Sequence, residues 1–344
     1  MALVDMASEL SEAIPGLDRI YSKTLIKRAW RVVRDSNLWS FQLAQGGFST
    51  PQLLTAGSIS VPGGIGSTTL IGDATATSAW AALSFYFSPT VQQIRANGYS
   101  IYSIIAYDNG SDPSSSPNFP FATLTLDRPF VDPLPFYTGV GYQMFQAYIP
   151  APAGFKRWLN IADMFNCWPL DIWTSRRTAN MVDPSRLYTS NPICVLPLGT
   201  DQRGAGTNNA SATLGQQLYE LYPNPSTAIS YQTYYVWTGP ELINNSDELP
   251  YPITQDVVLE KAKTYAYEWA EARKDVMAAK GSGANYLMLK KEAQSTFDIR
   301  LKGLRLLDKD AVDAFNIDMN SFMGQYRMPY FNSPAGRANM GLNF

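Results

Sequence analysis

The chain has 344 residues, of which 45% are hydrophobic, and a formal net charge of −2. This length suits two packed units, and the near-neutral balance supplies no strong overall field toward nucleic acid or an anionic membrane. There is no histidine and there are two cysteines, Cys167 and Cys194. This excludes Ser-His-Asp and Cys-His catalysis, His-ligated zinc, four-thiolate zinc sites and a disulfide framework, while one disulfide stays open.

The N-terminal sequence, MALVDMASELSEAIPG, has acidic residues where a signal peptide has a basic flank. No stretch approaches the roughly eighteen uninterrupted apolar residues of a membrane span. We therefore expect the chain to be made and kept in a cytoplasm-like compartment, with no membrane partner.

The first 44 residues predict two helices. Residues 3–14 form a short helix that stops at Pro15-Gly16, because proline disfavours helical geometry in the residue before it. A second helix starts near Ser22, and steps of about 100° per residue place its apolar side chains on one side. That side carries Leu25, Ile26, Ala29, Val32 and Val33. We expect Trp30, Trp39 and Phe41 to belong to the core beside it.

The opposite side of this second helix is basic. Residues 19–34 include six basic residues and no acidic one: Arg19, Lys23, Lys27, Arg28, Arg31 and Arg34. An ordinary solvated helix mixes charges of both signs. The pattern fits either a solvated face or a face that meets a partner or nucleic acid.

From residue 45 to about residue 254 short strand-like runs alternate with glycine, proline, serine and asparagine, which predicts an all-β barrel or sandwich. SISVPGGIGSTTLIG predicts a hairpin, and YSIIAYDN, ATLTLDRPF and GYQMFQAYIP predict strands. In residues 231–237 neither face is plainly polar, which favours a strand covered on both sides or lying at a subunit contact.

Helical periodicity returns in residues 255–310. Val258, Ala262, Tyr265 and Trp269 recur at alternating steps of four and three, GSGAN then breaks the chain, and a second stripe follows. The second stripe comprises Tyr286, Leu289, Ala293, Phe297, Leu301 and Leu304. We therefore predict an αα-hairpin that completes a helical bundle with residues 1–44, so the fold class is α+β with a large inserted β module.

The sequence loses this periodicity past Ala314, and residues 311–344 are predicted to form an extended tail. The tail has too few apolar residues to bury a core of its own, yet it carries aromatic and arginine anchors that favour docking on a partner. The anchors are Tyr326, Arg327, Tyr330, Phe331, Arg337 and Phe344.

Motifs with assigned chemistry are absent from the sequence. There is no P-loop, no strand-linked G-x-G-x-x-G, no G-x-S-x-G elbow and no C-x-x-C pair. DNGSD lacks the ligand spacing of a calcium loop, and GAGTNN lacks the strand-turn-helix context of a phosphate cradle. We expect no catalytic residue, no metal and no cofactor.

Several segments together resemble the head-to-tail connector, or adaptor, proteins of tailed bacteriophages. The resemblance rests on LIKRAWRVVRDSNLWSF, on ISVPGGIGSTTLIG, YSIIAYDN and ATLTLDRPF, on GYQMFQAYIPAPAGFKRWLNIAD, and on LYPNPSTAISYQTYYVWTGPELINNSDELPYPITQDVVLEKAKTYAYEWAEAR. These segments cover most of the chain. None of them carries an invariant chemical signature.

The resemblance implies a non-enzymatic virion protein that forms a closed ring of roughly twelve copies below the portal. Its partners would be the portal protein, a tail or nozzle protein, and genomic DNA that passes through the channel without sequence-specific binding. It would be made in the host bacterial cytoplasm and reside in the head-tail neck. The helical bundle would form the ring body, the β module would project from it, and the C-terminal extension would grip the portal.

Within that resemblance, we expect the basic residues of the second helix to contact the portal or a neighbouring subunit. The alternative from another class is a carbohydrate- or receptor-binding β-protein of a phage tail, with residues 158–173, rich in tryptophan, as its sugar platform. A histidine-free glycoside hydrolase using Asp163 and Asp171 is a third interpretation. The two C-terminal amphipathic helices count against both alternatives.

Overall fold

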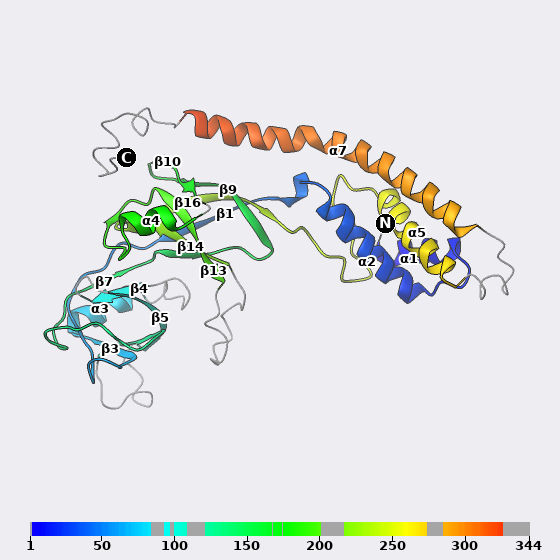
Figure 1. Ribbon diagram of the computed structural model, residues 1–344. Helices are drawn as coiled ribbons and strands as arrows, with labels where there is room; N and C mark the ends of the chain where they lie inside the picture. The colour runs from blue at the N-terminus through cyan, green and yellow to red at the C-terminus, as the bar shows by residue number, and fades with distance from the viewer. Residues whose placement is uncertain are drawn as a thin grey trace. The chain divides into compact units, whose positions relative to one another are not determined.

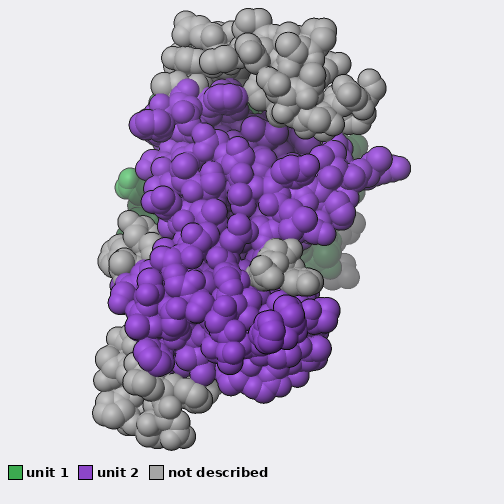
Figure 2. All heavy atoms as spheres, turned by 90° about the vertical axis from the view of Figure 1, so that its left-hand side faces the viewer, with its two compact units in different colours: residues 1–44, 236–344 green, residues 45–235 purple. Residues whose placement is uncertain are grey.

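The computed structural model describes residues 2–83, 93–96, 100–108, 121–166, 168–173, 175–200, 217–273 and 285–325, without the side chains of 82–83, 200 and 314–325 (Figure 1). The fold is mixed α+β. The chain divides into two compact units, which are coloured separately in Figure 2. Residues 1–44 and 236–344 form the first unit, and residues 45–235 form the second.

The first unit is built from helices of both ends of the chain. They are α1 (Leu3–Ala13), α2 (Arg19–Asp35), α5 (Gln255–Glu271) and α7 (Tyr286–Gln325), with the 3-10 turn η1 (Ser40–Gln42) after α2. α1 packs on α2, α2 on α5, and α5 on α7. One hydrophobic core joins all four helices, so segments about two hundred residues apart in sequence share the same buried surface.

The aromatic residues expected in the core, one within α2 and two just after it, lie there as predicted. Trp30 and Trp39 are fully buried, and Phe41 packs against the same core with its ring 5.8 Å from that of Trp30. Each indole N–H also has an acceptor: Trp30 donates to the Pro240 carbonyl at 2.9 Å and Trp39 to the Val33 carbonyl at 3.0 Å. Burial of these rings therefore leaves no indole N–H unsatisfied.

The inner face of α7 follows the predicted stripe, but the helix does not end where we expected. Tyr286, Ala293, Phe297, Leu301 and Leu304 are all buried, whereas the predicted boundary at residue 310 is wrong because α7 continues to Gln325. AVDAFNIDMNSFMGQ contains no proline and its only glycine is next to last, so nothing in it breaks backbone hydrogen bonding. Loss of apolar periodicity in the sequence therefore does not mark the end of this helix.

The second unit contains three main sheets and a short parallel pair. The first sheet has the order β1 (Leu43–Thr50), β16 (Ile229–Trp237), β9 (Phe155–Asp163) and β10 (Trp168–Pro169). The second has the order β11 (Asp171–Ile172), β13 (Cys194–Thr200), β14 (Gln217–Tyr222) and β8 (Tyr148–Pro150). β12 (Thr189–Ser190) pairs in parallel with β15 (Asn224–Pro225).

The third sheet curls into a nearly closed barrel. Its order is β2 (Ile59–Ser60), β3 (Thr69–Gly72), β6 (Thr123–Leu126), β5 (Ile101–Asp108), β4 (Gln93–Ala96) and β7 (Tyr142–Phe145). β2 and β3 form the predicted hairpin, with Ile59 opposite Gly72. Ile59 also exchanges both backbone hydrogen bonds with Val140, at 2.9 Å each, so the first strand reaches the segment that leads into the last.

Two helices, α3 (Ala74–Leu83) and α4 (Arg177–Val182), interrupt the region that we expected to be all β. The Asp73 carboxylate accepts the backbone N–H of Ala76 at 2.7 Å, which caps the first turn of α3 and lowers the pKa of Asp73. Trp80 on this helix is fully buried and donates to the Tyr142 hydroxyl at 2.9 Å. Aspartate followed by the alanine-rich ATATSAWAA was the helix signal in the sequence.

No helix in the described part of the chain combines the length and apolar character needed to cross a membrane.

We predict that Asp308→Ala destabilises the first unit by about 2 kcal/mol, because hydrogen bonds to a buried carboxylate are worth more than neutral ones. Asp308 is 2% exposed and receives the backbone N–H of Ser40 at 2.8 Å and the Ser40 hydroxyl at 2.5 Å, which ties α7 to η1. Urea unfolding followed by circular dichroism measures the change. Asp310→Ala, at an exposed position on the same helix, is the control, and equal stability of the two variants would contradict the prediction.

Candidate functional site

The basic face of α2 lies against a segment of its own unit, residues 240–248, that leads from β16 into α5. Lys23 Nζ donates to Asn245 Oδ1 at 2.8 Å, Lys27 Nζ to the Ile243 carbonyl at 3.1 Å, and Arg31 Nε to the Glu241 carboxylate at 3.2 Å. We call residues 240–248 the strap. With Arg34, which also pairs with Glu241, four of the six basic residues hold the strap, so the basic face is partly a structural clamp.

Arg34 was expected on the exposed basic face and is instead buried, with 7% of its surface exposed. Its guanidinium pairs with Glu241 and with Asp35, and its aliphatic stem lies close to Gly239. The chain that returns from the second unit covers the last turn of α2, which helical periodicity alone does not reveal. Arg34 is consequently inaccessible to another protein, and this part of the predicted contact is wrong.

Glu241 is the acidic centre of the clamp. It receives hydrogen bonds from Arg34 and Arg31, and these two cations lower the pKa of its carboxyl group. Because the charged form is stabilised by folding, the ion pairs support the native state only while Glu241 is ionised.

The far end of the strap reaches the start of the chain. The Asp247 carboxylate accepts the backbone N–H groups of Asn244 and Ile243, which lowers the pKa of Asp247. The Asp247 carbonyl in turn accepts the backbone N–H of Leu3 at 3.0 Å. The strap thus links the first turn of α1 to the basic face of α2. The strap lies more than two hundred residues after the α1 and α2 residues that it contacts. The sequence pattern therefore did not reveal the clamp.

The basic residues that remain most accessible are Arg19, Arg28 and Arg31. The Arg28 guanidinium lies 4.3 Å from the centre of the Tyr265 ring, an arrangement that orients the charge without neutralising it. Arg19 makes one long hydrogen bond, 3.4 Å, to the Val4 carbonyl. The Arg31 side chain keeps 61% of its surface exposed despite its ion pair. These three are the candidates for contact with a partner.

The anchors expected in the C-terminal tail lie outside the described residues, which end at residue 325. They are Tyr326, Arg327, Tyr330, Phe331, Arg337 and Phe344. Their proposed role rests on the sequence.

The sugar platform expected in residues 158–173 does not form as an exposed surface. Trp158 is 7% exposed and packs 4.5 Å from the ring of Phe155, whereas Trp168 keeps 37% of its surface exposed. Asp163 is 4% exposed and accepts hydrogen bonds from the backbone N–H of Phe165 and Asn166 and from the Asn166 side chain. It braces a turn, which leaves it poorly placed to act on a sugar.

Two features bear on cysteine and metal chemistry: the Cys194 thiol and the arrangement of potential metal ligands in the described residues. Cys194 is a buried free thiol, and burial raises its pKa to about 12, so it carries no thiolate near neutral pH. Cys167 lies outside the described residues. Within the described ranges no three His, Cys, Asp or Glu side chains gather as metal ligands would.

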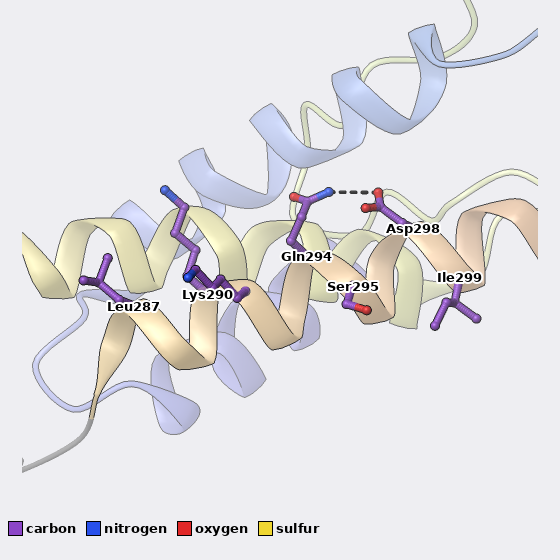
Figure 3. Close-up of a pocket in the computed structure, with 7 residues that line it drawn as sticks. Leu287, Lys290, Gln294, Ser295, Asp298 and Ile299 are labelled. Atoms are coloured by element: carbon purple, nitrogen blue, oxygen red, sulfur yellow. Dashed lines mark hydrogen bonds between the residues drawn. The ribbon is translucent and has the colours of Figure 1, made fainter.

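A groove of about 580 Å³ follows one side of α7 (Figure 3). All of its lining residues come from this one helix: Leu287, Lys290, Lys291, Gln294, Ser295, Asp298 and Ile299. A single convex helix cannot surround a small ligand, whose sites usually bury most of the ligand surface. The groove suits another helix or a macromolecular surface.

No protein-family model matches the chain, and a search of curated proteins finds no significantly similar sequence.

We predict that Glu241→Gln destabilises the protein by at most about 1 kcal/mol above about pH 5, because it removes one of the two carboxylates paired with buried Arg34, while solvent screens the 38% exposed Glu241 side chain. The folded-state pKa of Glu241 is lowered, so its contribution is present above the unfolded pKa and is lost as pH falls through the folded pKa. The difference from the parent protein should therefore shrink in acid. Denaturant unfolding across a pH series measures it.

The control for this series is Glu12→Gln, an exposed glutamate on α1. A destabilisation by Glu241→Gln that does not change with pH would contradict the electrostatic origin.

Proposed function

We propose that the protein is a non-enzymatic structural protein of a tailed-phage virion, which forms a ring below the portal and joins the head to the tail. The observation that carries this proposal is that the chain folds into two separately packed units. Helices from both ends close one core, while a separate β-rich unit is inserted between them. Two independently packed units allow one protein to meet a ring neighbour and an axial neighbour at once.

In this proposal the four helices of the first unit form the bundle of the ring body, and the second unit provides a contact with the tail side. The accessible Arg19, Arg28 and Arg31 contact the portal or the next subunit, and Lys23, Lys27 and Arg34 keep the strap in place. The C-terminal residues after α7 dock on the portal. DNA passes through the channel without base contacts, because a near-neutral protein makes few phosphate contacts.

Exposed apolar side chains on the second unit support its role as a contact surface. Phe165 is 86% exposed and Met164 52% exposed at the turn between β9 and β10, which the Asp163 carboxylate holds in one conformation. Phe136 and Met181 are also largely exposed. Large apolar residues on preordered turns are typical anchors of protein interfaces. We assign the turn between β9 and β10 to the contact with the tail or nozzle partner.

Electron microscopy of the assembly that copurifies with a tagged full-length chain tests the proposal. We expect a closed ring around an axial channel, placed between portal and tail components. A free monomer or trimer that binds glycans and lacks a portal would overturn it.

We predict that Arg19→Glu combined with Arg28→Glu reduces incorporation of the chain into this assembly at least about tenfold, since like charges across an interface cost several kcal/mol. Among the residues that the structure describes, neither arginine has an acidic partner, so the unfolding midpoint should stay close to that of the parent. Incorporation is measured by quantitative electrophoresis of purified particles. The matched control reverses Arg157 and Lys309, two exposed cations to which no contact is assigned, and should assemble normally.

A further inference from the structure

The outer face of α7 carries a second apolar stripe, opposite the one that packs on α5. Met288, Ile299 and Leu306 are 67%, 71% and 64% exposed. At about 100° per residue these three lie roughly opposite Phe297 and Leu304, which are buried. Exposed leucine and isoleucine in a repeating line on one helix mark a contact surface.

The stripe has the spacing of a helix-pairing seam. Its members, in order, are Met288, Glu292, Ser295, Ile299, Lys302 and Leu306, separated by steps of four, three, four, three and four. Alternating steps of four and three keep side chains on one line of a helix that packs along another helix. The line spans about 27 Å, at about 1.5 Å per residue.

The order of residues along this seam is complementary to itself when it is reversed. About a midpoint at position 297, Met288 mirrors Leu306, Glu292 mirrors Lys302, and Ser295 mirrors Ile299. Each mirror pair is compatible: apolar with apolar, acid with base, and small with large. An isologous contact requires this property, since residue i of one copy meets residue j of the other and the reverse.

The structure leaves the members of these pairs available. Glu292 and Lys302 are exposed, and neither forms an ion pair with another residue in the described ranges. Figure 3 shows Ser295 and Ile299 on the side of α7 away from Gln294 and Asp298, which hydrogen-bond to each other at 2.8 Å. A Cβ atom added at Gly303, beside Lys302, would meet nothing within 4 Å, so the surface there is open.

We propose that α7 is a self-association surface on which a second copy of this chain packs its own α7 antiparallel, about a two-fold axis near residue 297. The antiparallel direction follows from charge. A parallel pair would place Glu292 against Glu292 and Lys302 against Lys302, whereas the antiparallel pair forms two Glu292–Lys302 contacts.

This contact is distinct from the ring contact of the proposed function and does not depend on it. A ring closes through heterologous contacts between two different surfaces, whereas the α7 contact joins one surface to itself. A seam confined to one helix is a small interface, so we expect a reversible dimer that forms as the concentration rises.

Charge reversal on the full-length chain tests the proposal. E292K and K302E each place like charges opposite each other in a homodimer, so each should raise the dissociation constant at least about tenfold. The double variant E292K/K302E exchanges the two charges and should dimerise as the parent does. An equimolar mixture of the two single variants should form a heterodimer, because every altered position then faces an opposite charge.

Sedimentation equilibrium measures these constants, and circular dichroism confirms that the variants are folded. E12K, an exposed charge reversal on α1, is the control and should leave the dimer unchanged. A parent chain that stays monomeric at all concentrations would overturn the proposal, as would a dimer that is indifferent to both single reversals. Either result would leave the ring beneath the portal to be judged by microscopy alone.

Discussion

The ion pair between Arg34 and Glu241 fixes the point at which the chain returns from its inserted unit, and the helical unit depends on that return. The outgoing and returning segments of the chain meet there: Trp237 donates its indole N–H to the Phe41 carbonyl at 2.9 Å, and the Gln42 side chain donates to the Thr238 carbonyl at 3.5 Å. Because Arg34 is buried, its charge needs the Glu241 carboxylate. Separating the two segments here would leave the buried Arg34 charge without its Glu241 partner, which is energetically unfavourable.

This constraint explains how helices from the two ends of the chain share one core. α1 and α2 alone expose the apolar side that α5 covers, and α5 reaches it only after the strap has placed the chain along α2. The strap also receives the N–H groups of the first turn of α1, so the start of the chain is ordered by residues that follow the insertion. Folding of the first unit therefore couples its two sequence halves, because its one core takes buried side chains from both.

Helical periodicity predicted the inner faces of α2, α5 and α7 because one apolar side of each meets one neighbour. It failed at Arg34, since a covering segment from elsewhere in the chain does not alter the pattern of the helix it covers. α3 was missed because an alanine-rich segment has little apolar contrast between its faces, and the Asp73 cap was its one clear signal. The partners of Lys23 and Lys27 were beyond prediction, as the strap has no periodicity to place it.

The sequence of α7 predicted the face that packs on α5 but not the exposed apolar residues on the opposite face. Its inner stripe at Tyr286, Phe297 and Leu304 dominates the pattern, and the outer residues fall between these positions and look like ordinary surface. An outer stripe of large apolar side chains costs solubility in a free subunit unless something covers it. The proposed two-fold contact would meet that requirement, and in the proposed ring it would give way by mass action once many ring contacts form together.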